Sequence, residues 1–379
     1  MSVRTLALSM VSVFLPLYLY NLGYSLTAIM WYFLVFSLVR IPANFIAGYV
    51  IGKIGPKHTI AISTIAETTY MILLVSLKSF GWPILLLSVV QSIANSLFFT
   101  AYHVDFSKIK QTSDAGKEFS HMVVLEKIFG MIGPLVGGIL ATLVDVRLSV
   151  GVSIALLMLS LVPLFLSGEP VKLNQHVFYG GITQKLVSSK ANILAILAIN
   201  LGTVLSSITW VLFIGIAVFR NDVYAYIGVL ATVTTLLSII LAKYIGNQTD
   251  LGKGPKYMRI GAYGGVVFSL TKIFVNTPMA VAANSFFDAQ ALTIRQIPLG
   301  KGFYSETDNF PGQRIAYMVM LENLVHIFRI PFIILIILAL SYFDNQMEVL
   351  RYATVAAGTV TIFMVFEKFK ILRTGKSKT

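Results

Sequence analysis

The sequence predicts an all-α membrane protein whose twelve transmembrane helices form two pseudo-symmetric six-helix bundles. Of its 379 residues, 56% are hydrophobic and only 12% are charged, whereas a soluble domain usually has about 25% charged residues. Apolar runs recur along the whole chain and are long enough to cross a bilayer core about 30 Å thick, which needs about 20 helical residues. Because similar stretches recur in the same order in both halves, we assign six spans to each half.

Breaks in hydropathy, marked by charged residues or by Gly and Pro, delimit the spans of the first half. Arg4 precedes an apolar run that continues through Phe14, Tyr18 and Tyr20 without a small-residue cleavage pattern. We therefore expect this run to be a retained helix rather than a signal peptide. The first six spans are expected near residues 5–22, 27–51, 59–78, 82–102, 119–143 and 148–167.

The longest break, residues 168–190, contains Pro, Gly and Lys and is expected to be a cytoplasmic linker. It separates a six-helix bundle at 1–167 from a second bundle at 191–379, which ends in a short basic tail. The remaining six spans are expected near residues 191–219, 223–244, 258–275, 278–297, 315–342 and 347–366.

The distribution of basic residues predicts the orientation of the chain. If the N-terminus is cytoplasmic, 21 Lys and Arg residues fall in cytoplasmic segments and 5 in external loops. This asymmetry follows the positive-inside rule and predicts a multi-pass protein of the plasma membrane with both termini in the cytoplasm. The net charge of +13 therefore reflects topology, and no nucleic-acid partner is expected. Because the chain has no cysteine, it has neither disulfides nor a thiolate metal site.

Three pairs of stretches reveal an internal repeat. GYVIGKIGPKH, from Gly48, pairs with GNQTDLGKGPKY, from Gly246. ANSLFF, from Ala94, pairs with ANSFFD, and HMVVLEKIFG pairs with YMVMLENLVH. Two six-helix halves related by an axis along the membrane normal are one of the repeat architectures of secondary transporters.

The first of these stretches resembles the loop signature of the major facilitator superfamily, Gly-x3-Asp-Arg/Lys-x-Gly-x-Arg/Lys-Arg/Lys. Gly48, Lys53, Gly55 and Lys57 match it, whereas Gly52 replaces the acid. The weaker second copy keeps an acid at Asp250. The resemblance covers the whole chain and implies the superfamily fold, with these residues at a cytoplasmic gate.

In the superfamily the missing acid takes part in the charge network of that gate, so Gly52 puts the usual latch of the first half in doubt. Asp105, at the cytoplasmic end of the fourth span, is expected to engage Lys53 or Lys57 in one gate state. The alternative is that these residues are solvated loop charges.

The fifth span carries GPLVGG, which resembles the Gly-Pro-x-x-Gly-Gly motif frequent in the superfamily's exporters. Its small residues are also expected to allow a close helix crossing. The residues concerned are Gly133, Pro134, Gly137 and Gly138, with Gly130 one turn before them.

Charges at membrane depth indicate a second candidate site, because each costs at least ~2.5 kcal/mol on insertion scales. Glu322, His326 and Arg329 follow the spacing of one helix face. We expect Arg329 to pair with Asp288 of the preceding span, where an acid that is alternately paired and free can carry a proton. His326 is expected to pass protons or bind an anion. The alternative is a static cluster that fixes these two helices together.

Arg40 and Glu67 are expected to form a buried pair between the second and third spans. In the alternative, Arg40 faces the cavity and favours an anionic solute. Glu126, the repeat equivalent of Glu322, fits a gate role and a packing role equally well.

Polar side chains on other spans complete the expected cavity. The amides Gln91 and Asn95 lie one turn apart, and Asn284 is the repeat equivalent of Asn95. They are expected either to bind a solute or to join helices. Asn200 and Tyr18 are lesser cavity candidates.

The sequence lacks a nucleotide-phosphate loop and the common hydrolase motifs, so we expect no enzyme activity, cofactor or metal. The expected function is secondary transport of a small organic solute by alternating access, coupled to protons, with efflux antiport favoured. The alternatives are uptake symport of an organic anion and a non-transporting membrane receptor. The expected partners are the solute, protons and the bilayer, and the chain is expected to be a monomer.

Overall fold

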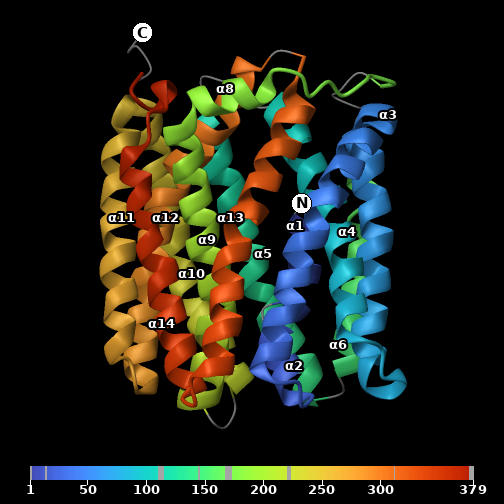
Figure 1. The fold of residues 1–379 in the computed structure, drawn as a ribbon, viewed down its shortest axis with the longest axis vertical. Coiled ribbons are helices and arrows are strands. Elements are labelled where there is room, and N and C mark those ends of the chain that lie inside the picture. Colours follow the sequence, from blue (N-terminus) through green and yellow to red (C-terminus); the bar gives the residue numbers. More distant parts are fainter. Residues whose placement is uncertain are drawn as a thin grey trace.

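The computed structural model describes residues 2–12, 15–109, 115–143, 146–166, 173–219, 223–310 and 312–374. Every regular element within these ranges is helical. The long helices run side by side along the longest axis of the molecule (Figure 1). Most connections therefore lie at its two ends.

The first half contains the six expected spans, although the helix boundaries differ. The described parts of the first span are α1 and α2, and the sixth span is divided into α6 and α7. The helices are α1 (Ser2–Ser12), α2 (Leu15–Asn21), α3 (Leu26–Phe80), α4 (Ile84–Ile109), α5 (Ala115–Leu143), α6 (Val146–Leu159) and α7 (Val162–Phe165).

The second and third spans are expected to be separate, yet both belong to the single element α3. Its two apolar stretches, Leu26–Ile54 and Pro56–Phe80, are each long enough to cross a membrane. Gly55 joins them with φ 85° and ψ 164°, a conformation that only glycine adopts without strain. Gly252 has φ 80° in the corresponding loop of the second half. Both copies of the signature therefore contain a glycine with positive φ where the chain changes direction.

The linker contains the short helix α8, and the second half begins with α9. Among the described residues of the whole chain, eight helical stretches are long and apolar enough to span a membrane. The helix α12 carries Asp288, Arg295 and Lys301, which lower its mean hydropathy. The helices are α8 (Ile182–Ser188), α9 (Lys190–Phe213), α10 (Val223–Gln248), α11 (Gly254–Thr271), α12 (Pro278–Glu306), α13 (Arg314–Tyr342) and α14 (Gln346–Thr359).

Short π and 3-10 segments extend several of these helices. They are η2 (Ile214–Val218), η3 (Thr249–Lys253), η4 (Lys272–Phe274), η5 (Thr307–Asn309), η6 (Val360–Phe366) and η7 (Lys370–Leu372). Both α4 and α12 continue about two turns beyond the expected ends of their spans. Charged residues in these extensions interrupt the apolar runs, so hydropathy predicts helix ends that are too early.

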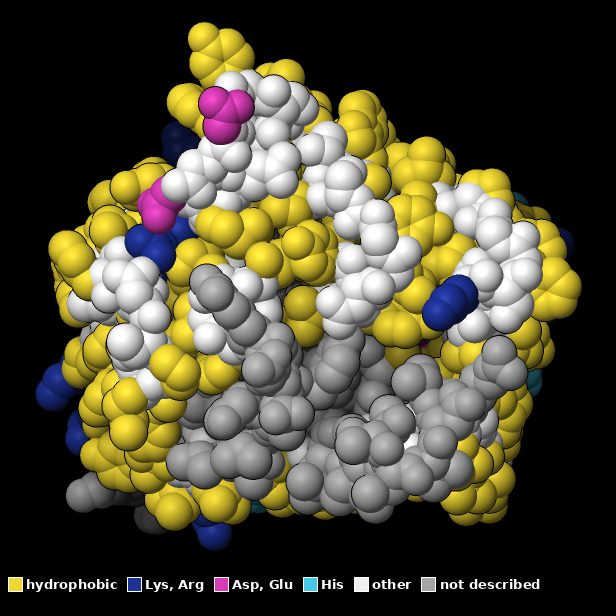
Figure 2. Space-filling view, turned by 90° about the horizontal axis from the view of Figure 1, so that it is seen from below, with side chains coloured by type: hydrophobic (Ala, Val, Ile, Leu, Met, Phe, Trp, Pro, Cys, Tyr) yellow, Lys and Arg dark blue, Asp and Glu magenta, His cyan; other side chains and the backbone are white. Residues whose placement is uncertain are grey.

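The two halves meet at the end of the molecule that carries α8 and the loop of Gly55, which we call the linker end. Asn44 of α3 donates a hydrogen bond from Nδ2 to Oδ1 of Asn323 on α13, at 2.9 Å. Nδ1 of His103 lies 2.8 Å from the hydroxyl of Tyr304. The opposite end shows mainly hydrophobic and uncharged side chains among the described residues (Figure 2). The sequence assigns few basic residues to this end.

Candidate functional site

A cavity of about 760 Å³ lies between the two halves. Its volume is in the range of small-molecule sites. Helices α3, α4, α5, α9, α12 and α13 line it, with Leu15 and Pro16 of α2. Most of the lining is apolar or aromatic. The charged and amide residues among the lining are Arg40, Gln91, Asn95, His103, Glu126, Asn200, Gln296, Glu322, His326 and Arg329.

The central contact in the cavity is an ion pair between the halves. Nη2 of Arg40 on α3 lies 3.0 Å from Oε2 of Glu322 on α13. The other carboxylate oxygen of Glu322 lies 3.6 Å from Nε2 of His103 on α4. Asn44 is about one turn closer to the linker end than Arg40, and its hydrogen bond to Asn323 joins α3 to α13 beside the ion pair.

The expected pair between Arg40 and Glu67 is wrong. Oε2 of Glu67 lies 3.7 Å from Nη2 of Arg4, and Nη1 of Arg4 donates a hydrogen bond to the hydroxyl of Thr64 at 3.1 Å. The guanidinium of Arg4 lies over the ring of Phe98, 3.8 Å from its centroid. Thus α1 supplies the counter-ion of Glu67, and Arg40 faces the cavity.

Glu322, His326 and Arg329 lie on one face of α13, as their spacing predicts, and this face lines the cavity. Arg329 is 5% exposed and His326 is 1% exposed, and both line the cavity with Glu322. Arg329 forms no hydrogen bond or ion pair with any residue in the described ranges, and its Nε is buried without a partner. Nδ1 of His326 is likewise without a partner there.

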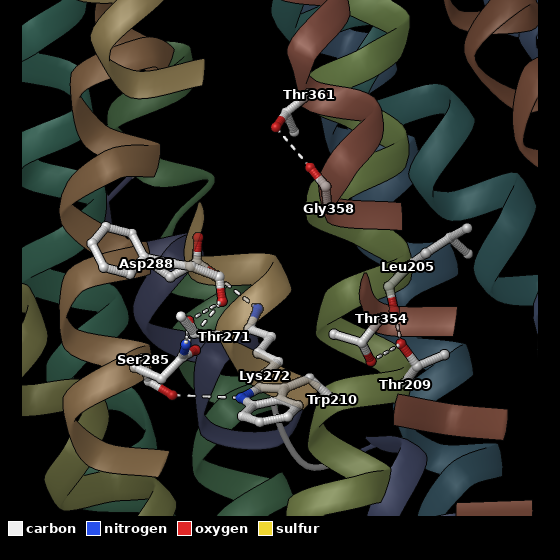
Figure 3. A network of polar contacts seen from close by, with 12 residues as sticks. Leu205, Thr209, Trp210, Thr271, Lys272, Ser285, Asp288, Thr354, Gly358 and Thr361 are labelled. Carbon is white, nitrogen blue, oxygen red and sulfur yellow. Dashed lines mark hydrogen bonds and ion pairs between the residues drawn. The ribbon is translucent and has the colours of Figure 1, made fainter. Parts of the chain in front are cut away.

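The expected pair between Asp288 and Arg329 is also wrong in this conformation. Oδ2 of Asp288 lies 2.7 Å from Nζ of Lys272, at the end of α11 (Figure 3). Lys272 also lies 5.2 Å from the ring centroid of Trp210, whose Nε1 donates to Ser285 at 3.4 Å. Asp288 does not line the cavity among the described residues, because its face of α12 packs against α11.

The amides divide between the two expected roles. Gln91 accepts a hydrogen bond of 2.6 Å from the hydroxyl of Tyr32, and Asn95 and Asn200 bond to carbonyls of their own helices. These three amides line the cavity. Asn284 does not, since its Nδ2 donates to the carbonyl of Phe268 and the hydroxyl of Thr271 and thereby joins α12 to α11.

Two other expected cavity residues have different surroundings. Tyr18 lies outside the described cavity lining and packs against the apolar core. Glu126 does line the cavity, and its Oε1 lies 3.4 Å from the hydroxyl of Tyr102. His103 and Gln296 were not expected in the lining, because a single polar residue in an apolar span does not reveal which way it faces.

The sequence profile of the Major Facilitator Superfamily matches residues 1–297. The chain belongs to the Major Facilitator Superfamily. Its members are transporters, so this multi-pass membrane protein is a transport protein rather than an enzyme. No curated protein sequence matches the chain significantly.

Solved superfamily structures share this fold. The human organic anion transporter MFSD10 (TETRAN) is 11% identical, with a TM-score of 0.68 over 96% of this chain and 97% of that one. A single-residue variant of the Escherichia coli fucose:proton symporter FucP is 12% identical, with a TM-score of 0.67 over 97% of this chain and 96% of that one. A bacterial homologue of the iron transporter ferroportin, in an outward-facing state, is 12% identical, with a TM-score of 0.61 over 96% of each chain.

The loop signature of the first half is packed closely against the linker. A Cβ atom on Gly52 would lie 2.8 Å from the carbonyl oxygen of Gln175, and the amide of Gln175 donates to the carbonyl of Gly52 at 3.0 Å. A Cβ on Gly48 would lie 2.7 Å from Val319 and 2.8 Å from the hydroxyl of Tyr179. The linker backbone therefore occupies the space that a side chain at position 52 would need.

The charged residues of the two signature copies differ in burial. Lys53 is exposed and its Nζ donates to the hydroxyl of Tyr49 at 3.2 Å, whereas Lys57 is buried. In the second copy, Oδ1 of Asp250 lies 2.7 Å from Nζ of Lys301, and both side chains are buried. The engagement of Asp105 with Lys53 or Lys57 stays a prediction.

The glycines of α5 bring it close to α1. A Cβ on Gly133 would lie 1.8 Å from Oγ of Ser9, and one on Gly137 would lie 2.5 Å from the carbonyl oxygen of Met10. The surroundings of Pro134 and Gly138 lie outside the described side chains. The motif thus has a packing role at this crossing.

Proposed function

We propose that this superfamily member is a secondary active transporter that moves a small organic solute by alternating access and is coupled to protons at Glu322. The observation that supports the proposal is the ion pair of Arg40 and Glu322, which joins the two halves inside the cavity. Rocking of the halves about a central site must change such a contact.

The chemistry of the pair links this motion to a proton. While Arg40 is within 3.0 Å, its positive charge offsets the negative charge of Glu322. When the halves separate at the linker end, Glu322 loses both Arg40 and His103, which lie on the first half, and sits in a mostly apolar cavity. An unpaired carboxylate in such surroundings is favoured in its protonated form. The fold is shared with a fucose:proton symporter, which is consistent with coupling of this kind.

The direction of transport has two candidates. Efflux antiport is favoured by the resemblance of GPLVGG to an exporter motif, although Gly133 and Gly137 also have a packing role. Uptake symport is favoured by Arg40 and Arg329 in the cavity lining, because buried cations there suit an organic anion taken up with protons. The charge asymmetry further supports an orientation with the linker end and both termini in the cytoplasm, and we place the protein in the plasma membrane.

The test is solute-dependent proton movement in liposomes that contain the purified protein and an internal pH-sensitive dye. A panel of organic anions, cations and neutral compounds is applied on one side. We expect the wild type to move protons with at least one compound and Glu322→Gln to lose this flux while it still exchanges solute. The matched control is Glu348→Gln, because Glu348 pairs with Arg351 outside the cavity.

The sign of the pH change in the wild type separates antiport from symport. Unchanged proton flux in well-folded Glu322→Gln would exclude Glu322 as the coupling residue. Absence of any solute flux across the panel would favour the non-transporting receptor.

A further inference from the structure

Among the described residues, the cavity lining contains one buried cation without a counter-ion. Four arginines are buried in the described part of the chain, namely Arg4, Arg40, Arg295 and Arg329. Arg4 contacts Glu67, Arg40 contacts Glu322, and Arg295 donates to the carbonyl of Gly261 at 3.1 Å. Arg329 alone among these four lacks a hydrogen bond or ion pair, and it lines the cavity.

The two acids in the described cavity lining are engaged elsewhere. Oε2 of Glu322 is paired with Arg40 at 3.0 Å, and its Oε1 lies 3.6 Å from Nε2 of His103. Glu126 contacts the hydroxyl of Tyr102 and lies within electrostatic range of its neighbour Lys127. The charge of Glu322 attracts Arg329 without contact, whereas the nearby charge of Arg40 repels it. The surroundings of Arg329 therefore carry an excess of positive charge.

A second polar atom lies on the same face of α13. Nδ1 of His326 is buried without a partner in the described ranges, and His326 precedes Arg329 by about one turn. The ring of Phe36 meets the imidazole edge to face, with centroids 6.1 Å apart. A buried guanidinium and imidazole without partners are costly unless a ligand completes their hydrogen bonds.

We propose that Arg329, assisted by His326, forms an anion-binding subsite and that the solute is a small organic anion with a single acidic group. A guanidinium binds a carboxylate through two parallel hydrogen bonds, which suits one acidic group at Arg329. Because Glu322 already neutralises Arg40, the described lining leaves the positive charge of Arg329 for the solute to match. The substrate class rests on the proposed transport function, whereas the subsite itself is defined by the contacts of Arg329.

The rest of the lining indicates the chemistry of the part of the anion that lies beyond its acidic group. Phe33, Phe36 and Phe99 of the first half line the cavity, and Leu292 and Val325 of the second half add aliphatic surface. Such a surface fits an aromatic or aliphatic body better than a sugar. A monocarboxylate with an aromatic ring, such as benzoate, is therefore the simplest probe.

The test measures binding to the full-length purified protein, so that it does not depend on transport. Thermal stability is recorded with benzoate, phenylacetate, butyrate and methanesulfonate, and with the neutral benzamide and the cationic benzylammonium. We expect the wild type to be stabilised by at least one organic anion and not by the neutral or cationic compounds. Arg329→Gln should weaken the binding of that anion about tenfold or more, the scale of losing hydrogen bonds to a charged group.

Two further variants keep the result interpretable. Arg295→Gln removes an arginine of equal burial outside the cavity and should bind the anion as the wild type does. Arg329→Lys keeps the charge without the forked geometry and should bind with intermediate affinity. Size-exclusion profiles verify folding.

Three results would overturn the proposal: no stabilisation of the wild type by any anion of the panel, equal stabilisation by benzamide, or undiminished binding in folded Arg329→Gln. None of them bears on proton coupling, which the Glu322→Gln flux measurement tests separately. Conversely, loss of proton coupling with intact anion binding would leave the subsite in place.

Discussion

Arg40 and Glu322 form an ion pair of 3.0 Å between the first and second halves of the transporter. The residues are 282 positions apart, and each lies on a helix that lines the central cavity. We expect Arg40→Glu and Glu322→Arg each to lower thermal stability, because each places two like charges together. The double exchange should recover part of the loss, with a coupling energy of about 0.5–3 kcal/mol in a double-mutant cycle. Strict additivity of the two single changes would show that the pair contributes nothing.

The sequence predicted the helices well because the bilayer imposes one strong pattern, an apolar run of fixed minimum length. It also placed Glu322, His326 and Arg329 on one face, since helical spacing alone determines that relationship. All three line the cavity. Helical spacing fixes the shared face but not the direction in which that face points.

The partners of buried charges were much harder to predict. Glu67 contacts Arg4 rather than Arg40, and Asp288 contacts Lys272 rather than Arg329. Each pairing depends on which helices are neighbours and how each is rotated, which hydropathy does not reveal. Both basic partners lie near the end of an apolar run, where the sequence does not reveal that the side chain is buried inside the bundle.

The internal repeat predicts the arrangement of the helices better than it predicts the contacts of their side chains. Glu126 and Glu322 are repeat equivalents and both line the cavity. Asn95 and Asn284 are equivalents too, yet only Asn95 lines it. Pseudo-symmetry preserves the arrangement of helices, whereas each half has its own side-chain partners.

Asp288→Asn tests whether Asp288 stabilises the fold through its ion pair with Lys272 or couples transport to protons. The change leaves Lys272 buried beside a neutral amide, and breaking a buried pair costs up to roughly 3–5 kcal/mol. We expect lower thermal stability but unchanged solute-dependent proton flux per folded molecule. A specific loss of proton flux, with solute exchange intact, would instead make Asp288 a coupling residue.

Gly52→Ala tests the docking of the linker. The added Cβ would lie 2.8 Å from the carbonyl oxygen of Gln175 and 2.9 Å from Val177, so the linker backbone must move. Overpacking of this kind typically costs about 1–3 kcal/mol. We expect faster amide hydrogen exchange at Gln175, whose hydrogen bond to Gly52 holds the linker in place.

The matched control for this change is Gly151→Ala on α6, where no atom lies within 4 Å of the added Cβ. Linker exchange should be unaltered in that variant. Equal exchange rates at Gln175 in Gly52→Ala and the wild type would contradict the proposed role of the linker backbone.

Gly133→Ala tests the crossing of α1 and α5. Its Cβ would lie 1.8 Å from Oγ of Ser9 and 2.8 Å from the backbone oxygen of Leu6, which forces the helices apart. Gly130→Ala is the control one turn earlier, since its nearest neighbour would be Thr5 at an ordinary 3.7 Å. We expect thermal stability to fall for Gly133→Ala and to be maintained or slightly raised for Gly130→Ala. A similar change of thermal stability in both variants would contradict the claim that the close crossing of α1 and α5 requires glycine at position 133.

The most direct test of transport by alternating access uses the contact between Asn44 and Asn323, which are joined by a hydrogen bond of 2.9 Å between the two halves. The chain has no native cysteine, so Asn44→Cys combined with Asn323→Cys gives a protein with two thiols only. A short, reducible bifunctional thiol reagent should cross-link them, stop solute exchange in liposomes and release it again on reduction, while either single variant stays active. Full exchange by the completely cross-linked protein would contradict separation of the two halves at this contact.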